Sequence, residues 1–296
     1  MEYLREHPPV TVIGGANADI GGGPAASLRL HDSNPGTIRV RAGGVGRNIA
    51  HDLRLLGVQV RLIAAVGDDL FGRWLREDCE ALGMDVSAML TVPDARSSSY
   101  LYVTDGDGEM HVGISDMDVV RCVTPAVLRP LTGEINASAA VVADANLSEE
   151  TLAFLAENCA APLYADPVST AKAPRLLPLL PKLAAFKPNA LEAALLTGEE
   201  DPERAARALL RRGVGRVFVS LGADGLLAAE GEQLLRLPCL PGEIVNTTGA
   251  GDAAMAAIVW AGLQGYDLRR AAEAALAAGA QTCAVEETNP PALILE

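Results

Sequence analysis

Short apolar segments alternate with helical segments along the second half of the chain, and this alternation restricts the fold more than any other feature. Each apolar segment ends in polar residues, as in Asp166-Pro167-Val168-Ser169. Such a repeat predicts an α/β fold in which a mainly parallel central sheet is covered by helices on both faces. Polar side chains, Asp166 among them, then gather at the edge of the sheet where α/β proteins bind ligands. The apolar segments are 141–143, 163–165 and 184–186, and the expected helices are 149–158, 190–196 and 202–212.

A glycine bend at residues 249–251 stands directly before a stretch that favours helix from residue 253. The start of a helix offers unpaired N–H groups and the positive end of the helix dipole, which suit a phosphate group. Asp252 could accept a proton from a hydroxyl while these amides stabilise a phosphoryl group in transfer. The alternative is that Asp252 only caps the helix. Residues 253–263 are apolar on every face, which indicates a buried helix and favours the first interpretation.

The segment 246–252 reads Asn-Thr-Thr-Gly-Ala-Gly-Asp. It resembles the second signature of the ribokinase-like (PfkB) sugar and nucleoside kinases, usually written Asp-Thr-x-Gly-Ala-Gly-Asp. The resemblance implies that Asp252 is the catalytic base. It also implies that the amides of Gly249, Ala250 and Gly251 form an anion hole for the phosphoryl group.

The first position of this signature is Asn246, where most members of the family have Asp. In many relatives that position helps to form a site for a monovalent cation. The resemblance therefore implies a K⁺ site near Asn246 and Thr248, with the Asn as a departure from the common pattern.

The glycine-rich segment 42–50 contains Gly-Gly-x-x-x-Asn-x-Ala, which resembles the first family signature. There, the paired glycines Gly43 and Gly44 let the backbone approach a sugar, and the Asn48 side chain bonds a sugar hydroxyl. In the earlier segment Asn17-Ala18-Asp19, the Asp corresponds to a family residue that contacts ribose hydroxyls. From this segment alone, ordinary turn chemistry explains the two polar residues equally well.

Three further segments interrupt the βα alternation and resemble half-exposed strands: 37–41, 98–103 and 109–114. The last two flank Thr104-Asp105-Gly106-Asp107-Gly108, which is a hairpin signal. We therefore expect one domain, 1–296, with a discontinuous β-sheet lid formed by about 21–42 and 97–117. The family resemblance implies that the lid covers the substrate, excludes water on closing and mediates a homodimer. The alternative is a surface hairpin without a gating role.

Two other segments match family positions near the nucleotide. Asn189 and Glu192 match an Asn-x-x-Glu that lies near Mg²⁺ and the phosphates, with Glu192 acting on the metal through water. Taken alone, a helical i, i+3 pair of this kind is unremarkable. The resemblance implies ATP and Mg²⁺ as cofactors, with the loop 277–282 beside the adenine. The expected nucleotide-binding residues are Asn189, Glu192, Ser220, Gly222, Gly225 and Gly279.

The net charge of −14 argues against a nucleic-acid backbone or an anionic membrane surface as the main partner. A small nucleotide is still allowed, because backbone amides bind phosphate whatever the total charge. The five cysteines are widely separated and include no Cys-x-x-Cys pair, which predicts reduced thiols rather than disulfides or a zinc site. With an amino-terminal segment that lacks a signal-peptide pattern, these features predict a cytoplasmic enzyme.

Several segments resemble the pseudouridine kinase subgroup of the family more than ribokinase or adenosine kinase: 32–36, 43–50, 97–101, 116–117, 144–150 and 287–290. The predicted function is therefore ATP-dependent phosphorylation of the 5′-hydroxyl of pseudouridine. Polar side chains of the lid, Ser33, Asn34 and Ser98, are expected to contact the extra ring N–H and the carbonyls of this nucleoside. The expected substrate-binding residues are Asn17, Asp19, Ser33, Asn34, Gly43, Gly44, Asn48, Ser98 and Asp166.

Two alternatives stay open at this level. The chain could be a ribokinase-like kinase of another nucleoside or of a sugar, or a catalytically silent regulator that binds a nucleotide or sugar. The intact Gly-Ala-Gly-Asp argues against silence, because a binding protein does not need the base. A Rossmann-type dehydrogenase is disfavoured, since the turn at Gly14-Gly15 lacks the Gly-x-Gly-x-x-Gly pattern.

Overall fold

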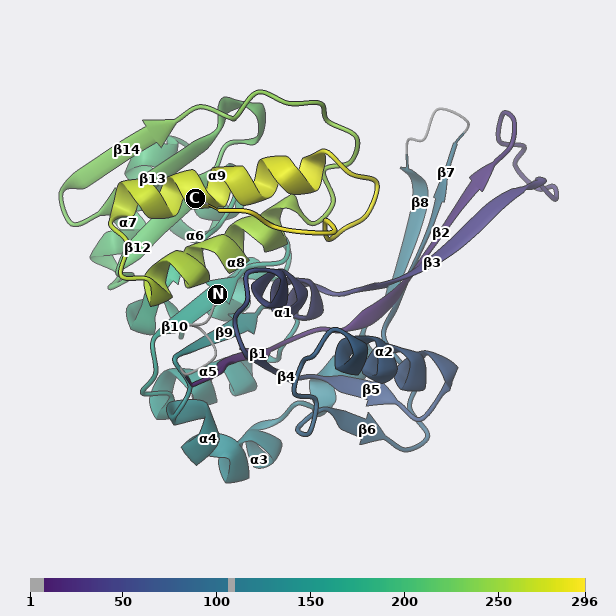
Figure 1. Ribbon diagram of the computed structural model, residues 1–296, viewed down its shortest axis with the longest axis horizontal. Helices are drawn as coiled ribbons and strands as arrows, with labels where there is room; N and C mark the ends of the chain where they lie inside the picture. Colours follow the sequence, from purple (N-terminus) through teal and green to yellow (C-terminus); the bar gives the residue numbers. More distant parts are fainter. Residues whose placement is uncertain (1–7, 106–109, 296) are drawn as a thin grey trace.

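The alternating segments build an eight-stranded sheet in the computed structural model, which describes residues 8–105 and 110–295 (Figure 1). The strand order is β14-β13-β12-β11-β10-β9-β1-β4, with β12 through β4 parallel and β13 and β14 antiparallel to their neighbours. The predicted α/β fold with a mainly parallel central sheet is therefore confirmed. The strands of this sheet are β1 (Val10–Ile13), β4 (Val60–Ile63), β9 (Ala140–Asp144), β10 (Leu163–Asp166), β11 (Leu183–Phe186), β12 (Arg216–Ser220), β13 (Leu226–Glu230) and β14 (Gln233–Leu237).

Helices cover both faces of this sheet, so its central strands are buried on both sides and are apolar almost throughout. α1, α8 and α9 pack on one face, and α3 to α7 pack on the other. As expected from its sequence, α8 is largely buried between the sheet and its neighbouring helices. The helices are α1 (Val45–Leu55), α2 (Leu70–Ala81), α3 (Pro125–Leu128), α4 (Thr132–Asn136), α5 (Glu149–Asn158), α6 (Ala190–Thr197), α7 (Pro202–Arg211), α8 (Ala250–Leu263) and α9 (Leu268–Cys283).

A four-stranded sheet projects from this α/β body, as Figure 1 shows. It contains β2 (Asn17–Pro24), β3 (Gly36–Gly43), β7 (Ser99–Thr104) and β8 (Met110–Asp116), in the order β3-β2-β7-β8. Most of the segments expected to form a lid lie in this sheet, although β2 begins earlier, at Asn17. Residues 106–109, within the expected hairpin, lie outside the described residues. A short parallel pair, β5 (Ala65–Gly67) and β6 (Leu90–Val92), lies near the base of the sheet (Figure 1).

The two faces of the projecting sheet differ in chemistry. One face carries the aliphatic cross-strand row Val40, Ile20, Leu101 and Ile114. The opposite face carries the rows Arg41, Asp19, Tyr100, Ser115 and Arg39, Gly21, Tyr102, Gly113. We call these the outer face and the inner face.

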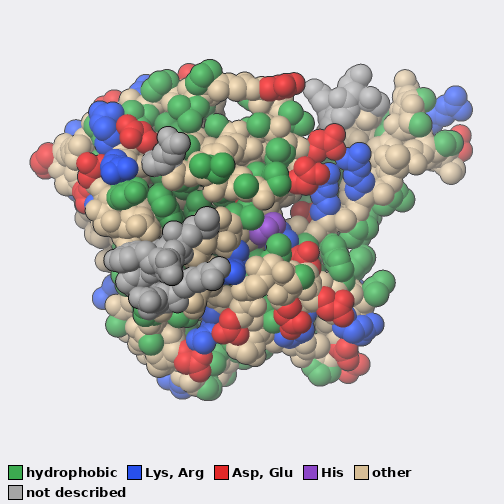
Figure 2. Space-filling model, in the orientation of Figure 1, with side chains coloured by type: hydrophobic (Ala, Val, Ile, Leu, Met, Phe, Trp, Pro, Cys, Tyr) green, Lys and Arg blue, Asp and Glu red, His purple; other side chains and the backbone are tan. Residues whose placement is uncertain are grey.

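Two arginines connect the inner face to the body. Arg39 Nη1 lies 2.8 Å from Glu286 Oε2, and Arg41 Nη1 donates to the Glu286 carbonyl at 2.7 Å. Figure 2 shows acidic and basic side chains side by side where the sheet meets the body. The inner face is therefore turned toward the segment that follows α9.

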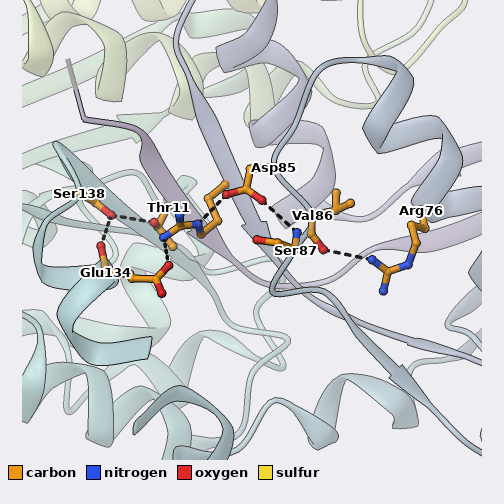
Figure 3. A network of polar contacts seen from close by, with 8 residues as sticks. Thr11, Arg76, Asp85, Val86, Ser87, Glu134 and Ser138 are labelled. Carbon is orange, nitrogen blue, oxygen red and sulfur yellow. Dashed lines mark hydrogen bonds and ion pairs between the residues drawn. The ribbon is translucent and has the colours of Figure 1, made fainter. Parts of the chain in front are cut away.

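A polar network closes the amino-terminal edge of the main sheet (Figure 3). Arg61 on β4 contacts Asp85 at 2.9 Å and Glu134 at 2.6 Å, while the buried Thr11 and Ser138 hydroxyls lie 2.7 Å apart. These contacts hold β1, β4 and the segment before β9 together. They stabilise the edge opposite the polar residues that follow the strands.

Across residues 8–105 and 110–295, no helix combines the length and the apolar composition that crossing a membrane requires. The five cysteines are free, which agrees with the expectation of reduced thiols.

Candidate active site

A buried carboxylate after β9 organises the polar edge of the sheet. Asp144 accepts hydrogen bonds from the backbone N–H of Gly15 at 2.8 Å, Gly46 at 2.9 Å and Asn146 at 2.8 Å. These amides lie in the turn after β1, in the first turn of α1 and in the turn after β9. Asp144 therefore fixes the turn after β1 against the start of α1, and so places the glycine-rich segment.

The glycine bend forms the start of α8, and the helix begins earlier than expected, at Ala250 rather than near residue 253. Gly249 is the N-cap, with φ 84°, and a Cβ at this position would overlap the Thr288 carbonyl oxygen. Glycine is therefore required both by its conformation and by its neighbour. The first amides of α8 precede the first intrahelical bond, from the Ala253 N–H to the Gly249 carbonyl, and the Ala250 N–H donates to the Thr247 carbonyl at 3.4 Å.

Asp252 lies in the first turn of α8 and is half-buried. Its Oδ2 accepts a hydrogen bond at 2.9 Å from Nδ2 of Asn48, on α1. Since Gly249 supplies the N-cap and has no side chain, the capping alternative does not describe how Asp252 is bonded. The structure instead joins the two residues that the family signatures assign to base and sugar binding.

A buried lysine lies among the carboxylates behind Asp252. Lys187 Nζ lies 3.3 Å from Oδ2 of Asp166, and both side chains are buried. Burial by itself lowers the pKa of Lys187, but the carboxylates of Asp166, Glu192 and Asp252 raise it above its usual value. Burial raises the pKa of Asp252 well above its usual range, and repulsion from Asp166 raises it further. A carboxylate shifted in this direction suits proton transfer near neutral pH.

The expected sugar-binding residues of β2 and β3 lie together. Asn17 Nδ2 donates to Oδ1 of Asp19, and a Cβ at Gly43 would overlap the Asp19 carboxylate. Burial raises the pKa of Asp19 to about 6, against the lowering effects of Arg47 and Asn17. Gly44 has φ 100° and is the N-cap of α1, which carries Asn48.

The three polar residues expected to contact a base, Ser33, Asn34 and Ser98, lie in two separate parts of the projecting sheet. Ser33 and Asn34 lie in the exposed loop between β2 and β3, and Asn34 Nδ2 bonds the Arg29 carbonyl at 2.8 Å. This loop lies at the tip of the sheet, about 16 Å along β2 from Asp19 by strand rise. Ser98 instead lies buried at the start of β7, and its Oγ has no hydrogen-bond partner among the described residues. The structure therefore keeps Ser98 near Asp19 and places Ser33 and Asn34 away from it.

Asn189 and Glu192 form a reciprocal capping box at the start of α6. Asn189 Oδ1 accepts from the Glu192 N–H at 2.9 Å, and Glu192 Oε2 accepts from the Asn189 N–H at 2.8 Å. Both side chains therefore stabilise the helix start, which was the alternative interpretation of this pair. Glu192 is also buried beside Lys187, and burial raises its pKa.

Two of the other expected nucleotide-binding residues, Gly222 and Gly225, adjoin residues that line a cavity of about 650 Å³ between the end of β14 and α9. Gly222 accepts a hydrogen bond from Cys239 Sγ at 3.1 Å, and a Cβ at Gly225 would overlap the Leu237 carbonyl. A Cβ at Gly279 would lie 3.6 Å from the Ala250 carbonyl, next to the anion hole. Ser220 lies beside Asn189, and its N–H donates to Pro188 O at 3.0 Å. The cavity is lined by Leu237, Pro238, Cys239, Leu240, Pro241, Arg270, Glu273, Ala274, Leu276, Ala277, Ile294 and Leu295.

The residues near Asn246 do not fit a monovalent cation. Asn246 Oδ1 accepts from the Thr248 N–H at 3.0 Å, so its Nδ2 is directed at the Glu286 carbonyl, 3.0 Å away. The guanidinium of Arg41 donates to the same carbonyl oxygen at 2.7 Å. Two N–H donors, one of them positively charged, therefore bind this carbonyl oxygen, which disfavours a cation beside it.

For a divalent cation, the described residues contain no group of three or more His, Cys, Asp or Glu side chains that could hold it. Asp166 and Glu192 offer carboxylate oxygens near the start of α8, with Lys187 between them. This donor set fits Mg²⁺ that takes its remaining ligands from nucleotide phosphates and water, as is usual for this ion.

A buried network behind Asn48 was not identified from the sequence. Arg47 Nη1 donates to Asn289 Oδ1 at 2.7 Å, and Arg47 Nη2 lies 2.7 Å from Asp78 Oδ2. Asn289 Nδ2 donates to Asp52 Oδ1 at 2.9 Å and is 3.2 Å from the Asn48 carbonyl. The segments 43–50 and 287–290 were noted for their resemblance, but a contact across 242 positions leaves no local signal.

Comparisons with known proteins identify the family of the chain. Residues 9–294 match the family described as pfkB family carbohydrate kinase. The chain is 37% identical to pseudouridine kinase of Escherichia coli over 98% of its own length and 95% of the relative. A carbohydrate kinase structure from Agrobacterium tumefaciens superposes with TM-score 0.82 at 32% identity, covering 95% of this chain and 92% of that one. The Arabidopsis thaliana ribokinase complexed with ribose and ATP gives TM-score 0.82 at 22% identity, covering 96% of each chain, which confirms the ribokinase-like fold.

The buried Asp52 should make the stability of the protein depend on pH. Burial raises its pKa to about 7, so the folded state keeps a proton that the unfolded state releases above its usual value of 3.8. This contribution is complete below about pH 4 and is lost as pH rises through about 7. Wild type should therefore lose about 3 kcal/mol of unfolding free energy between pH 5 and pH 8 that Asp52→Asn does not lose. The difference in stability between the two proteins should grow by this amount as pH rises.

Urea denaturation at several pH values measures this difference. Asp118→Asn, at an exposed side chain, is the control and should run parallel to wild type. An Asp52→Asn curve that also runs parallel to wild type would contradict the assignment.

Proposed function

Because this chain belongs to the pfkB family of carbohydrate kinases, we propose that it transfers the γ-phosphoryl group of ATP to the 5′-hydroxyl of pseudouridine. One observation carries the kinase proposal. Asp252, whose pKa is raised, lies in the first turn of α8 after the N-cap Gly249 and accepts a hydrogen bond from Asn48. The identity with the pseudouridine kinase relative over nearly the whole chain supports the choice of acceptor.

Asp252 would act as the base. Its carboxylate would accept the 5′-hydroxyl proton as the new oxygen–phosphorus bond forms and the bond to ADP breaks. The amides of the helix start, at Gly249, Ala250 and Gly251, would stabilise the negative charge on the phosphoryl oxygens. Asp19 and Asn48 would hold the ribose hydroxyls, so that the 5′-oxygen lies in line with the phosphoryl group.

The nucleotide would extend from the cavity beside α9 to the start of α8. Its adenine would occupy the cavity near Ala277, and its phosphates would pass Gly279 toward Ala250. Mg²⁺, reached through water from Glu192 and Asp166, would neutralise phosphate charge when bound. We assign no role to K⁺, because Arg41 and Asn246 take the Glu286 carbonyl.

Phosphate transfer from labelled ATP to a pool of nucleosides and sugars tests the proposal. Steady-state kinetics with pseudouridine, uridine, adenosine and ribose then identifies the acceptor, and we expect the highest kcat/KM for pseudouridine. Turnover of ribose that equals or exceeds that of pseudouridine would overturn the acceptor in favour of a sugar kinase. Transfer to no compound would favour a catalytically silent binding protein.

Asp252→Asn tests the base directly. We expect kcat to fall by about 10²- to 10⁴-fold with little change in the KM of the nucleoside, because the lost carboxylate accepts the proton only in the transition state. In wild type, kcat should decrease as pH falls through the raised pKa of Asp252, since only the deprotonated carboxylate accepts the proton. The residual activity of the variant should lack this acidic limb, and near-normal turnover would remove the base role.

We also propose that two copies pair through the outer face of the projecting sheet. Its aliphatic side chains remain accessible, with Ile38 at 78%, Ile114 at 63% and Val112 at 46% exposed. Light scattering after gel filtration should give twice the chain mass of 30.8 kDa. The double variant Ile38→Lys with Ile114→Lys should be monomeric, because two charges would be buried at the interface. A monomeric wild type would exclude this pairing.

A further inference from the structure

Two tyrosines of β7 lie flat on the inner face of the projecting sheet. The ring centroids of Tyr100 and Tyr102 are 5.6 Å apart, and their planes differ by 31°. A Cβ at Gly21 would lie 2.5 Å from the Tyr102 ring, and one at Gly113 would lie 2.8 Å from Tyr100 Oη. The glycines of the neighbouring strands therefore leave room for the rings to lean over them. Both rings are half-buried, so part of each remains accessible.

The rings lie beside the carboxylate expected to hold the sugar. In the cross-strand register, Tyr100 is paired with Asp19, and Tyr102 is paired with Gly21. Neighbouring strands are about 4.8 Å apart, so Tyr100 adjoins Asp19 directly and Tyr102 continues the surface toward the tip. The same face is turned to the body by Arg39 and Arg41.

Packing within the sheet explains only part of the pair, through Tyr100 Oη, which lies 3.1 Å from Met110 Sδ. The aliphatic side chains of these strands point to the outer face, whereas the cross-strand neighbours of the two rings are polar or lack a side chain. Those neighbours are Asp19, Gly21, Gly113 and Ser115. A flat apolar surface in polar surroundings, next to a sugar-binding carboxylate, is suited to a planar ligand.

We propose that Tyr100 and Tyr102 form a stacking platform for the heterocyclic base of the acceptor nucleoside. This inference rests on the proposed function and deepens it, since it names the surface that distinguishes a nucleoside from a base-free sugar. Stacking tolerates different bases because each has a π face. The platform therefore supplies affinity for pyrimidine nucleosides, whether the base is linked through carbon or nitrogen.

Calorimetric binding of pseudouridine, uridine and ribose, without ATP, tests the platform. Tyr102→Leu and Tyr100→Leu should each raise the Kd of both nucleosides about tenfold, because the stacking surface is lost. The corresponding Phe variants keep the ring and should bind nucleosides within about twofold of wild type. Leu variants that keep the wild-type nucleoside Kd would overturn the platform. A Kd for ribose that rises by the same factor would also overturn it, because the base would then carry no part of the loss.

Two adjacent glycines offer a matched pair of variants that leaves both tyrosines in place. Gly21→Ala would force the Tyr102 ring off the sheet, whereas a Cβ at Gly22 meets nothing within 4 Å. Since successive residues of a strand face opposite sides, Gly22→Ala adds its methyl group to the outer face. We expect Gly21→Ala to weaken nucleoside binding several-fold and Gly22→Ala to leave it unchanged. Equal effects of the two variants would overturn the inference.

The platform and the proposed activity can fail separately. If wild type binds nucleosides in a tyrosine-dependent way but transfers no phosphoryl group, the activity fails and the platform stands. If wild type phosphorylates a nucleoside while the Leu variants bind it normally, the platform fails and the activity stands. Absence of nucleoside binding by wild type would overturn both.

Discussion

The hydrogen bond between Asn48 and Asp252 connects the two halves of the candidate site. It joins α1, which follows the glycine-rich segment, to α8, which begins at the glycine bend, across 204 positions of sequence. Behind it, Asn289 bonds the Asn48 backbone and the Arg47 side chain, so the partner of the carboxylate is itself held in place. The geometry proposed for catalysis thus depends on contacts that begin well away from the reacting atoms.

The site contains several charged side chains in buried positions, where an ionised group is unfavourable unless it is paired. Asp166, Lys187 and Glu192 are each about 5% exposed, and Asp252 lies next to them. Burial raises the pKa values of Asp252 and Glu192, and repulsion from Asp166 raises them further, because one ammonium cannot neutralise all of these carboxylates. Such an arrangement is expensive for folding and is typical of sites that move protons or bind additional cations.

Much of the fold follows from local pattern, but the supporting contacts do not. The alternation after residue 139 predicted the main sheet, because buried parallel strands need apolar runs separated by helices. The predicted start of α8 was too late because helix propensity disfavours Gly251, whereas the folded helix includes this residue and has Gly249 as its N-cap. Contacts such as Asp144 with the Gly15 and Gly46 amides join residues 129 and 98 positions apart, so only the folded chain reveals them.

The contacts of Arg39 and Arg41 with Glu286, which join the projecting sheet to the segment after α9, are weak. Arg39 and Glu286 are each 62% exposed in their side chains, and such ion pairs contribute about 0–1 kcal/mol. Salt in the surrounding medium screens them further. The hydrogen bond from Arg41 to a backbone carbonyl adds a similarly modest amount. Separating Arg39 and Arg41 from Glu286 therefore requires little energy, whereas the base of the sheet, where Asn17 and Ala18 are buried, is held by the core itself.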